Sequence, residues 1–147
     1  MTGGITGGVD ALIHASCVAI GGRAVLLGGE PGAGKSDLAL RLIDRGAALV
    51  SDDYTELRNS AGRVLARAPA TIAGKIEVRG LGILELPATA DVPVCLYADL
   101  GSAPERLPEA AAIWLAGEEI PRIALAALEA SAALKLEQAL VRFGLPL

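Results

Sequence analysis

The sequence predicts an α/β domain, with a mixed sheet and hairpins, built around a loop that holds phosphate. Three observations carry this prediction. Short apolar runs alternate with turn-forming residues, as in strands joined by hairpins. One run, residues 24–28, leads directly into the glycine-rich string GGEPGAGKSD. A segment with helically spaced leucines follows, which completes the strand, loop and helix order of a phosphate-binding unit.

Length and composition indicate one domain. The chain has 147 residues, of which 52% are hydrophobic, enough for a single packed core. The formal net charge is −4 and no basic block occurs, so we expect no nucleic-acid partner. No apolar run reaches about 18 residues and no secretory signal is visible, so we expect no membrane partner and a cytoplasmic location. We expect residues 1–12 to be a loose terminus and 13–147 to be the domain.

The first predicted elements are a hairpin and a helix. Apolar runs on both sides of Gly21 and Gly22 indicate two strands joined by a tight turn. Leu38 and Leu42 share one face of the following helix, and Gly46 stands where that helix would stop.

Further strands and a loop are predicted along the middle of the chain. The run ALV at 48–50 predicts a short buried strand that ends at two carboxylates. A hairpin turning at 59–62 follows, and 76–86 is an apolar run containing glycines that suggest a bulge. The β-branched run VPVCLYADL predicts a central strand, and residues 99–110, with glycine, serine and two prolines, predict a mobile loop.

The last predicted element is an amphipathic helix within 129–143. Leu136, Ala139, Leu140 and Phe143 recur at the spacing of one helical face, and a glycine follows them. The two cysteines of the chain lie far apart and form no CxxC pair, so we expect them to be reduced core residues.

The glycine-rich loop matches the pattern G-x4-G-K-[ST] in full. Its glycines let successive backbone N–H groups turn inward around a β-phosphate. Lys35 would place a charge between the β- and γ-phosphates, and the Ser36 hydroxyl would bind Mg²⁺. We therefore predict a nucleotide site formed by Gly29, Glu30, Pro31, Gly32, Ala33, Gly34, Lys35 and Ser36.

Asp52 and Asp53 are the next candidates, 17 and 18 residues after Lys35. A strand beside the loop strand would deliver them to the γ-phosphate side of the nucleotide. One carboxylate could take a proton from an incoming hydroxyl while its neighbour holds Mg²⁺ through water. The pattern does not decide which does which. By itself, such a pair also fits a solvated turn after a strand.

Short sequence motifs help to distinguish several classes of nucleotide-binding protein. The chain has neither the DxxG nor the NKxD string that a GTPase would need. A small-molecule kinase stays open, although residues 99–122 carry only Arg106 and Arg122 as lid arginines. A nucleotide-sensing module that binds ATP and a partner without transferring phosphate also stays open.

Four strings, taken in order, resemble the HPr kinase/phosphorylase family. They are IHAS at 13–16, GEPGAGKSDLALRLIDRG at 29–46, LVSDD at 49–53 and IEVRGLGILEL at 76–86, the last of the form E-x-R-G-x-G. The resemblance implies a P-loop α/β kinase core similar to phosphoenolpyruvate carboxykinase. It implies ATP and Mg²⁺ as cofactors and assembly as a homo-hexamer. Because the motifs begin near residue 13, it also implies a minimal form with the C-terminal catalytic domain only.

The activity implied by the resemblance is phosphorylation of a serine on HPr, the phosphocarrier of a phosphotransferase system. In such short forms, that system is expected to be regulatory. Many relatives also run the reverse reaction, in which phosphate removes the phosphoryl group and pyrophosphate leaves. Here Pro108 stands where the family has glycine after the loop's Arg-Leu pair, which predicts a stiffer loop that favours the forward reaction.

The resemblance also implies residue roles. Asp52 corresponds to the base that accepts the serine proton, with Asp53 as its partner. The implied catalytic residues are His14, Lys35, Asp52, Asp53 and Arg106. The implied metal residues are Ser36 and Glu77. Without the resemblance, His14 fits a packed or capping residue, Glu77 and Arg79 fit a surface ion pair, and Arg106 fits a loop charge.

Overall fold

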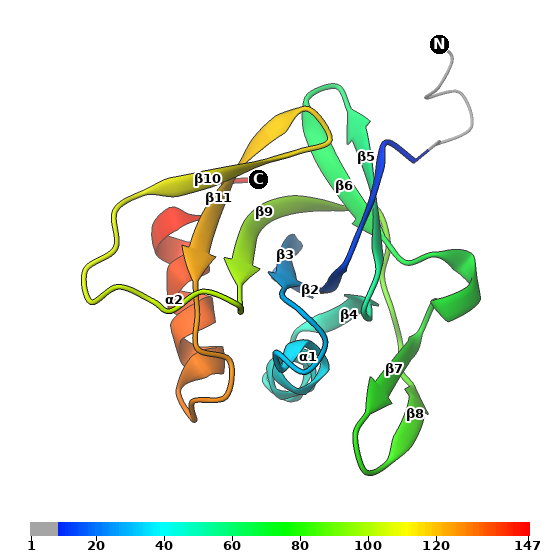
Figure 1. Cartoon of the computed structure of the whole chain (residues 1–147). Coiled ribbons are helices and arrows are strands. Elements are labelled where there is room, and N and C mark those ends of the chain that lie inside the picture. Colours follow the sequence, from blue (N-terminus) through cyan, green and yellow to red (C-terminus); the bar gives the residue numbers. More distant parts are fainter. Residues whose placement is uncertain (1–8) are drawn as a thin grey trace.

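A computed structural model describes residues 9–147 (Figure 1). Residues 1–8, most of the expected loose terminus, lie outside the described residues. The first strand, β1, spans Ala11–Ile13 and begins two residues before residue 13, where we expected the domain to start. Within the described range, no helix is both long and apolar enough to cross a membrane.

Most of the chain forms one curled nine-stranded sheet that carries two helices, α1 and α2. The remaining strands of this sheet are β2 (Ala15–Ile20), β3 (Arg23–Gly28), β4 (Ala48–Ser51), β5 (Thr55–Ser60), β6 (Arg63–Arg67), β9 (Val92–Asp99), β10 (Ala111–Leu115) and β11 (Glu118–Ala124). The helices are α1 (Lys35–Asp44) and α2 (Ala132–Phe143). A separate hairpin, β7 (Lys75–Val78) and β8 (Gly82–Glu85), extends from the body, and a short 3-10 turn spans Ala70–Ile72 (Figure 1). The α/β class with a mixed sheet is confirmed.

Three parallel strands at the centre of the sheet end in one row. β3 runs parallel to β9, and β9 runs parallel to β11. Their last residues, Gly28, Asp99 and Ala124, are register partners across the three strands. The segments that follow these residues therefore leave the sheet at the same edge, which is where open α/β sheets bind ligands.

The strand before the two aspartates lies one position further from the loop strand than expected. We expected β4 to lie beside β3, but the antiparallel strand β2 is inserted between them. Since β2 is antiparallel to both neighbours, β3 and β4 run in the same direction. Their carboxyl ends still lie at the same edge of the sheet, so the inserted strand does not separate Asp52 from the glycine-rich loop at 29–36.

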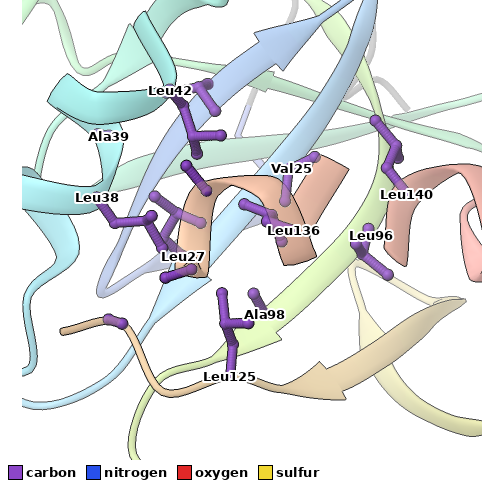
Figure 2. Packing of buried hydrophobic residues seen from close by; sticks show 14 of the residues in the cluster. Val25, Leu27, Leu38, Ala39, Leu42, Leu96, Ala98, Leu125, Leu136 and Leu140 are labelled. Atoms are coloured by element: carbon purple, nitrogen blue, oxygen red, sulfur yellow. The ribbon is translucent and has the colours of Figure 1, made fainter. Parts of the chain in front are cut away.

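Alternate residues of β3 face two hydrophobic cores. Val25 and Leu27 face the core that α1 and α2 complete (Figure 2). Ala24 and Leu26 face a second core formed with the curled part of the sheet. A strand buried on both faces reads as a continuous apolar run, which is how it appears in the sequence. The helices contribute Leu38, Leu42, Leu136 and Leu140, all almost fully buried.

The predicted turns and helices agree closely with the structure. The hairpins turn at Gly21–Gly22 and at Ala61–Gly62, all four residues having positive φ. The first helix stops before Gly46, and β9 lies inside the sheet with neighbours on both sides. Cys17 and Cys95 are free and buried as expected, and burial raises the pKa of the Cys17 thiol.

One prediction about strands is wrong, and one hairpin was not predicted. The run 76–86 is a hairpin rather than one bulged strand, so Arg79 lies in its turn and not beside Glu77 on a strand. The hairpin β10–β11 was not predicted. Its turn at Ala116–Gly117 has the positive φ values of a two-residue turn, but the alanine-rich β10 lacks the β-branched pattern that marks a strand.

Candidate active site

The loop that matches the phosphate-binding pattern, residues 29–36, connects β3 to α1 and is tightly wound; we call it the phosphate loop. A Cβ atom placed on Gly29 would lie 2.9 Å from Ala33 Cβ, so only glycine fits there. Gly34, the residue before α1, has a φ of 97°, in the left-handed region that favours glycine. The pattern read from the sequence therefore forms a compact loop at a helix start, which suits a phosphate group.

Lys35 closes this loop on itself. Its Nζ donates to the carbonyl oxygens of Gly29 at 2.8 Å and Glu30 at 3.1 Å. The residue is only 6% exposed, although it carries a full charge. Among residues 9–147, this ammonium group contacts only neutral carbonyl oxygens, so it attracts an anion electrostatically.

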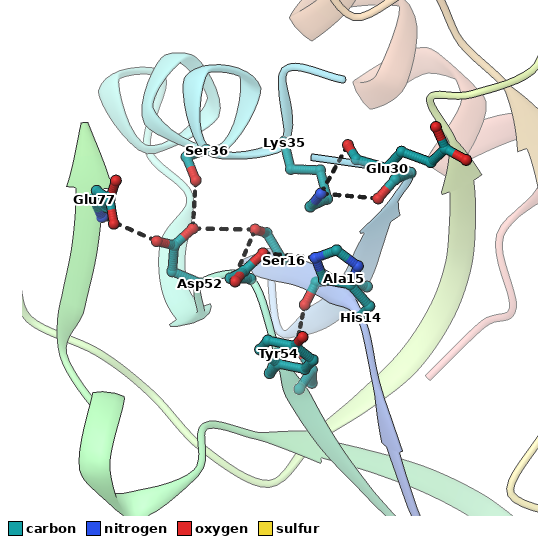
Figure 3. A network of polar contacts seen from close by, with 12 residues as sticks. His14, Ala15, Ser16, Glu30, Lys35, Ser36, Asp52, Tyr54 and Glu77 are labelled. Atoms are coloured by element: carbon teal, nitrogen blue, oxygen red, sulfur yellow. Dashed lines mark hydrogen bonds and ion pairs between the residues drawn. The ribbon is translucent and has the colours of Figure 1, made fainter. Parts of the chain in front are cut away.

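Asp52 is the centre of a buried polar cluster (Figure 3). Its Oδ1 accepts hydrogen bonds from the hydroxyls of Ser36 at 2.6 Å and Ser16 at 3.1 Å. Its Oδ2 accepts from the backbone N–H of Glu77 at 2.9 Å. Asp52 is 7% exposed. We call Asp52, Ser36, Ser16 and Glu77 the Asp52 network; it joins β4, α1, β2 and β7.

Asp53 faces solvent instead of the network. Its carboxylate pairs with His14 Nε2 at 2.8 Å, and its side chain is 55% exposed. The His14 ring stacks on Tyr54 with 4.9 Å between ring centres. The backbone N–H of Asp53 donates to Ser16 Oγ, so this one hydroxyl contacts both aspartates. The two carboxylates make separate contacts, and the backbone at Asp53 is left-handed, with φ of 66°.

The other two predicted residues, Glu77 and Arg106, are exposed. Glu77 reaches the network through its backbone N–H, while its residue as a whole is exposed. Arg106 is exposed on the segment between β9 and β10. Among residues 9–147, no hydrogen bond joins Arg106 to the Asp52 network.

Sequence reasoning missed a second polar cluster at the end of β9. Asp99 accepts from Ser102 Oγ and the backbone N–H of Gly101, each at 2.8 Å, and pairs with Arg122 of β11. Burial raises the pKa of Asp99, but these hydrogen bonds and the Arg122 charge outweigh it, so the pKa lies below its ordinary value. The cluster fixes the start of the 100–110 segment beside the phosphate loop.

Ser16 and Tyr54 were also missed as site residues. Ser16 is the last residue of the string IHAS, and Tyr54 directly follows the string LVSDD. Ser16 is two residues after His14 and Tyr54 is next to Asp53, and this closeness in the sequence was the available signal.

A cavity of about 700 Å³ lies elsewhere, between the 102–112 segment, β11 and the end of α2. No residue of the phosphate loop or of the Asp52 network lines it. In the described part of the chain, no group of three or more histidine, cysteine or acidic residues could hold a metal. A metal ion bound beside the phosphate loop would therefore take phosphate oxygens as some of its ligands, as Mg²⁺ commonly does.

The fold and the site together define an α/β domain with a phosphate loop and a carboxylate held against the loop's serine. The chain belongs to the family of the HPr serine kinase C-terminal domain, whose family model matches residues 9–90. That segment contains His14, the phosphate loop, both aspartates and Glu77.

Curated relatives agree with this family. An HPr kinase/phosphorylase of Clostridium tetani is 41% identical over 79 residues, which are 54% of this chain and 26% of the relative. That of Clostridium beijerinckii is 42% identical over 77 residues, 52% of this chain and 26% of the relative. The chain thus spans about a quarter of the length of these relatives.

A solved structure is similar over nearly the whole chain. The HPr(Ser) kinase/phosphatase from Coxiella burnetii matches with a TM-score of 0.76 and 28% identity. The match covers 90% of this chain and 94% of that one. The likeness therefore extends beyond the segment that the family model covers.

Proposed function

We propose that this protein is an ATP- and Mg²⁺-dependent kinase that phosphorylates a serine of an HPr-like phosphocarrier protein. The family membership supports the reaction class. One observation carries the assignment of the site: the Asp52 carboxylate lies 2.6 Å from the hydroxyl of Ser36, the last residue of the phosphate loop. A carboxylate is thus available where the transferred phosphoryl group would lie.

The phosphate loop is the proposed site for the triphosphate of ATP. Its compact winding, the start of α1 and the buried charge of Lys35 all favour a polyphosphate anion. Mg²⁺ would be held by Ser36 and Glu77, with Asp52 close by. Once bound, it would neutralise charge on the phosphate oxygens.

In the forward reaction, the substrate serine oxygen forms a bond to the γ-phosphorus while the bond to the ADP oxygen breaks. We propose that Asp52 accepts the serine proton. Its Oδ1 already accepts hydrogen bonds from the hydroxyls of Ser36 and Ser16, so a hydroxyl donor can reach this carboxylate. Asp53, paired with His14 at the solvent side, is the alternative base.

The proposal includes the reverse reaction at the same site. An oxygen of inorganic phosphate forms a bond to the phosphorus of phosphoserine while the bond to the serine oxygen breaks; pyrophosphate forms, and the serine oxygen takes up the proton. By microscopic reversibility, the residue that acts as base in one direction acts as acid in the other. Arg106 is proposed to close over the phosphates when the partner protein docks. Assembly as a hexamer and a cytoplasmic location remain predictions.

The test is phosphoserine formation on purified HPr from labelled ATP. Asp52→Asn should lower transfer by about 10²–10⁴-fold and leave ATP binding within a few-fold of the wild type. Asp44→Asn, an exposed aspartate at the far end of α1, is the matched control.

Asp53→Asn decides between the two carboxylates. If its loss is large and that of Asp52→Asn is small, Asp53 is the base. If the wild type binds ATP and forms no phosphoserine, the protein is a nucleotide-binding module and the kinase proposal is wrong.

A further inference from the structure

The two sides of the phosphate loop differ in chemistry. On the β4 side lies the Asp52 network, which is polar and receives the transferred phosphoryl group in our proposal. On the other side, β9 and β11 end in the same row as β3. If the terminal phosphate of a nucleotide points toward Asp52, its sugar and base have room on the opposite side, where the segments that follow these two strands lie.

The segment after β11, residues 125–131, touches the phosphate loop; we call it the β11–α2 loop. A Cβ atom placed on Gly34 would lie 3.1 Å from Leu128 Cδ2 and 3.3 Å from Ala127 Cβ. Ala127 is buried, whereas Leu128 is 77% exposed. The loop thus presents a large apolar side chain to solvent directly beside the last glycine of the phosphate loop.

Arg41 holds this loop in place. Its guanidinium donates to the carbonyl oxygens of Ala127 and Glu129, and it also pairs with Asp37 on its own helix. Glu129 pairs in turn with Lys135 of α2. α1 begins inside the phosphate loop. Because Arg41 lies on α1 and binds the β11–α2 loop, it fixes the position of Leu128 relative to the phosphate loop.

We propose that the β11–α2 loop is the site of the nucleotide base, with Leu128 packing against the face of the aromatic ring and Arg41 as a positioning residue. The inference rests on the proposed function, because it requires a nucleotide in the phosphate loop. Residues 125–128 read Leu-Ala-Ala-Leu and offer no polar side chain. The contact is therefore apolar.

Two ligands distinguish the contribution of the base to binding affinity from that of the phosphates. Isothermal titration calorimetry with Mg²⁺ measures the affinity for ATP and for inorganic tripolyphosphate, which lacks both base and sugar. Leu128→Ala should weaken ATP binding about tenfold, the effect of lost apolar contact in a pocket. It should leave tripolyphosphate binding within about twofold. Leu128→Met keeps an apolar side chain and should bind ATP almost as the wild type does.

Arg41→Ala tests the positioning role. Because Arg41 lies outside the phosphate loop, its removal should lower the ratio of ATP to tripolyphosphate affinity in the same direction as Leu128→Ala. A general loss of folding would weaken both ligands together and leave that ratio unchanged. Val141→Ala, which trims an equally exposed apolar side chain on the far half of α2, is the control and should change neither affinity.

The outcomes are distinct from those of the kinase assay. If ATP and tripolyphosphate bind the wild type equally well, no base site exists and the inference is wrong. Equal weakening of both ligands by Leu128→Ala also overturns it, because Leu128 would then act only by supporting Gly34. A selective loss of ATP affinity supports it even where no phosphoserine forms, so failure of phosphoryl transfer does not count against the base site.

Discussion

The Ser36 hydroxyl donates to Asp52 Oδ1 at 2.6 Å, although the strands that precede the two residues, β3 and β4, are not neighbours in the sheet. Ser36 lies in the first turn of α1, and Asp52 follows β4, which is separated from β3 by β2. The contact exists because β3 and β4 end at the same edge. It joins the two residues for which the sequence suggested metal binding and proton transfer.

Lys35→Met tests the phosphate loop. The methionine keeps most of the buried stem but removes the charge that now contacts Gly29 and Glu30. We expect ATP affinity to fall at least about tenfold, the loss of a hydrogen bond to a charged group. We expect a nearly unchanged melting temperature. Calorimetric titration and thermal unfolding measure the two effects, and wild-type ATP affinity would show that the loop does not bind phosphate.

Ser16→Ala tests the link between the two aspartates. Ser16 is fully buried, donates to Asp52 and accepts from the backbone N–H of Asp53. Its removal leaves that N–H without its hydroxyl partner, at a cost of about 1–3 kcal/mol in the free energy of unfolding. We also expect slower transfer to HPr with unchanged ATP binding. Ser60→Ala, at the end of β5, is the control; transfer equal to the wild type would remove Ser16 from the site.

Arg106→Ala tests the segment between β9 and β10. Arg106 is exposed and lies outside the Asp52 network, so the free enzyme should bind ATP normally. If the arginine closes over the phosphates when HPr docks, it stabilises negative charge in the transition state, and its loss lowers turnover. Rates of phosphoserine formation and of phosphorolysis should be measured on one preparation. Unchanged turnover would dismiss the role, and phosphorolysis as fast as the kinase step would contradict the predicted preference for the forward reaction.

The Asp99 cluster predicts a pH dependence of stability. The pKa of Asp99 is lower in the folded than in the unfolded chain, so the unfolded state binds more protons as the solution becomes acidic. The stabilisation is therefore complete above the unfolded value of about 4 and is lost as the pH falls through the folded pKa. Urea unfolding between pH 7 and pH 3 should show a smaller decline for Asp99→Asn than for the wild type. An identical decline would show that other groups carry it.

Local sequence determined the parts of this protein that depend on a few adjacent residues. Gly21, Gly22 and Gly62 set two hairpin turns, the glycine-rich loop set the start of α1, and leucine spacing identified the buried faces of both helices. These features need only backbone preferences and short-range spacing. His14, Lys35 and the two aspartates lie within such short strings, so the sequence alone was enough to name them as candidates.

Tertiary structure decided the rest. Insertion of β2 between β3 and β4, the pairing of Ser16 with both aspartates and the contact of Leu128 with Gly34 all join residues distant in sequence. The alanine-rich strand β10 forms because β11 offers it a partner, and Asp53 adopts a left-handed backbone because Ser16 and His14 hold it from the neighbouring strand. Such pairings depend on which strands meet in the folded chain, and no local pattern records that choice.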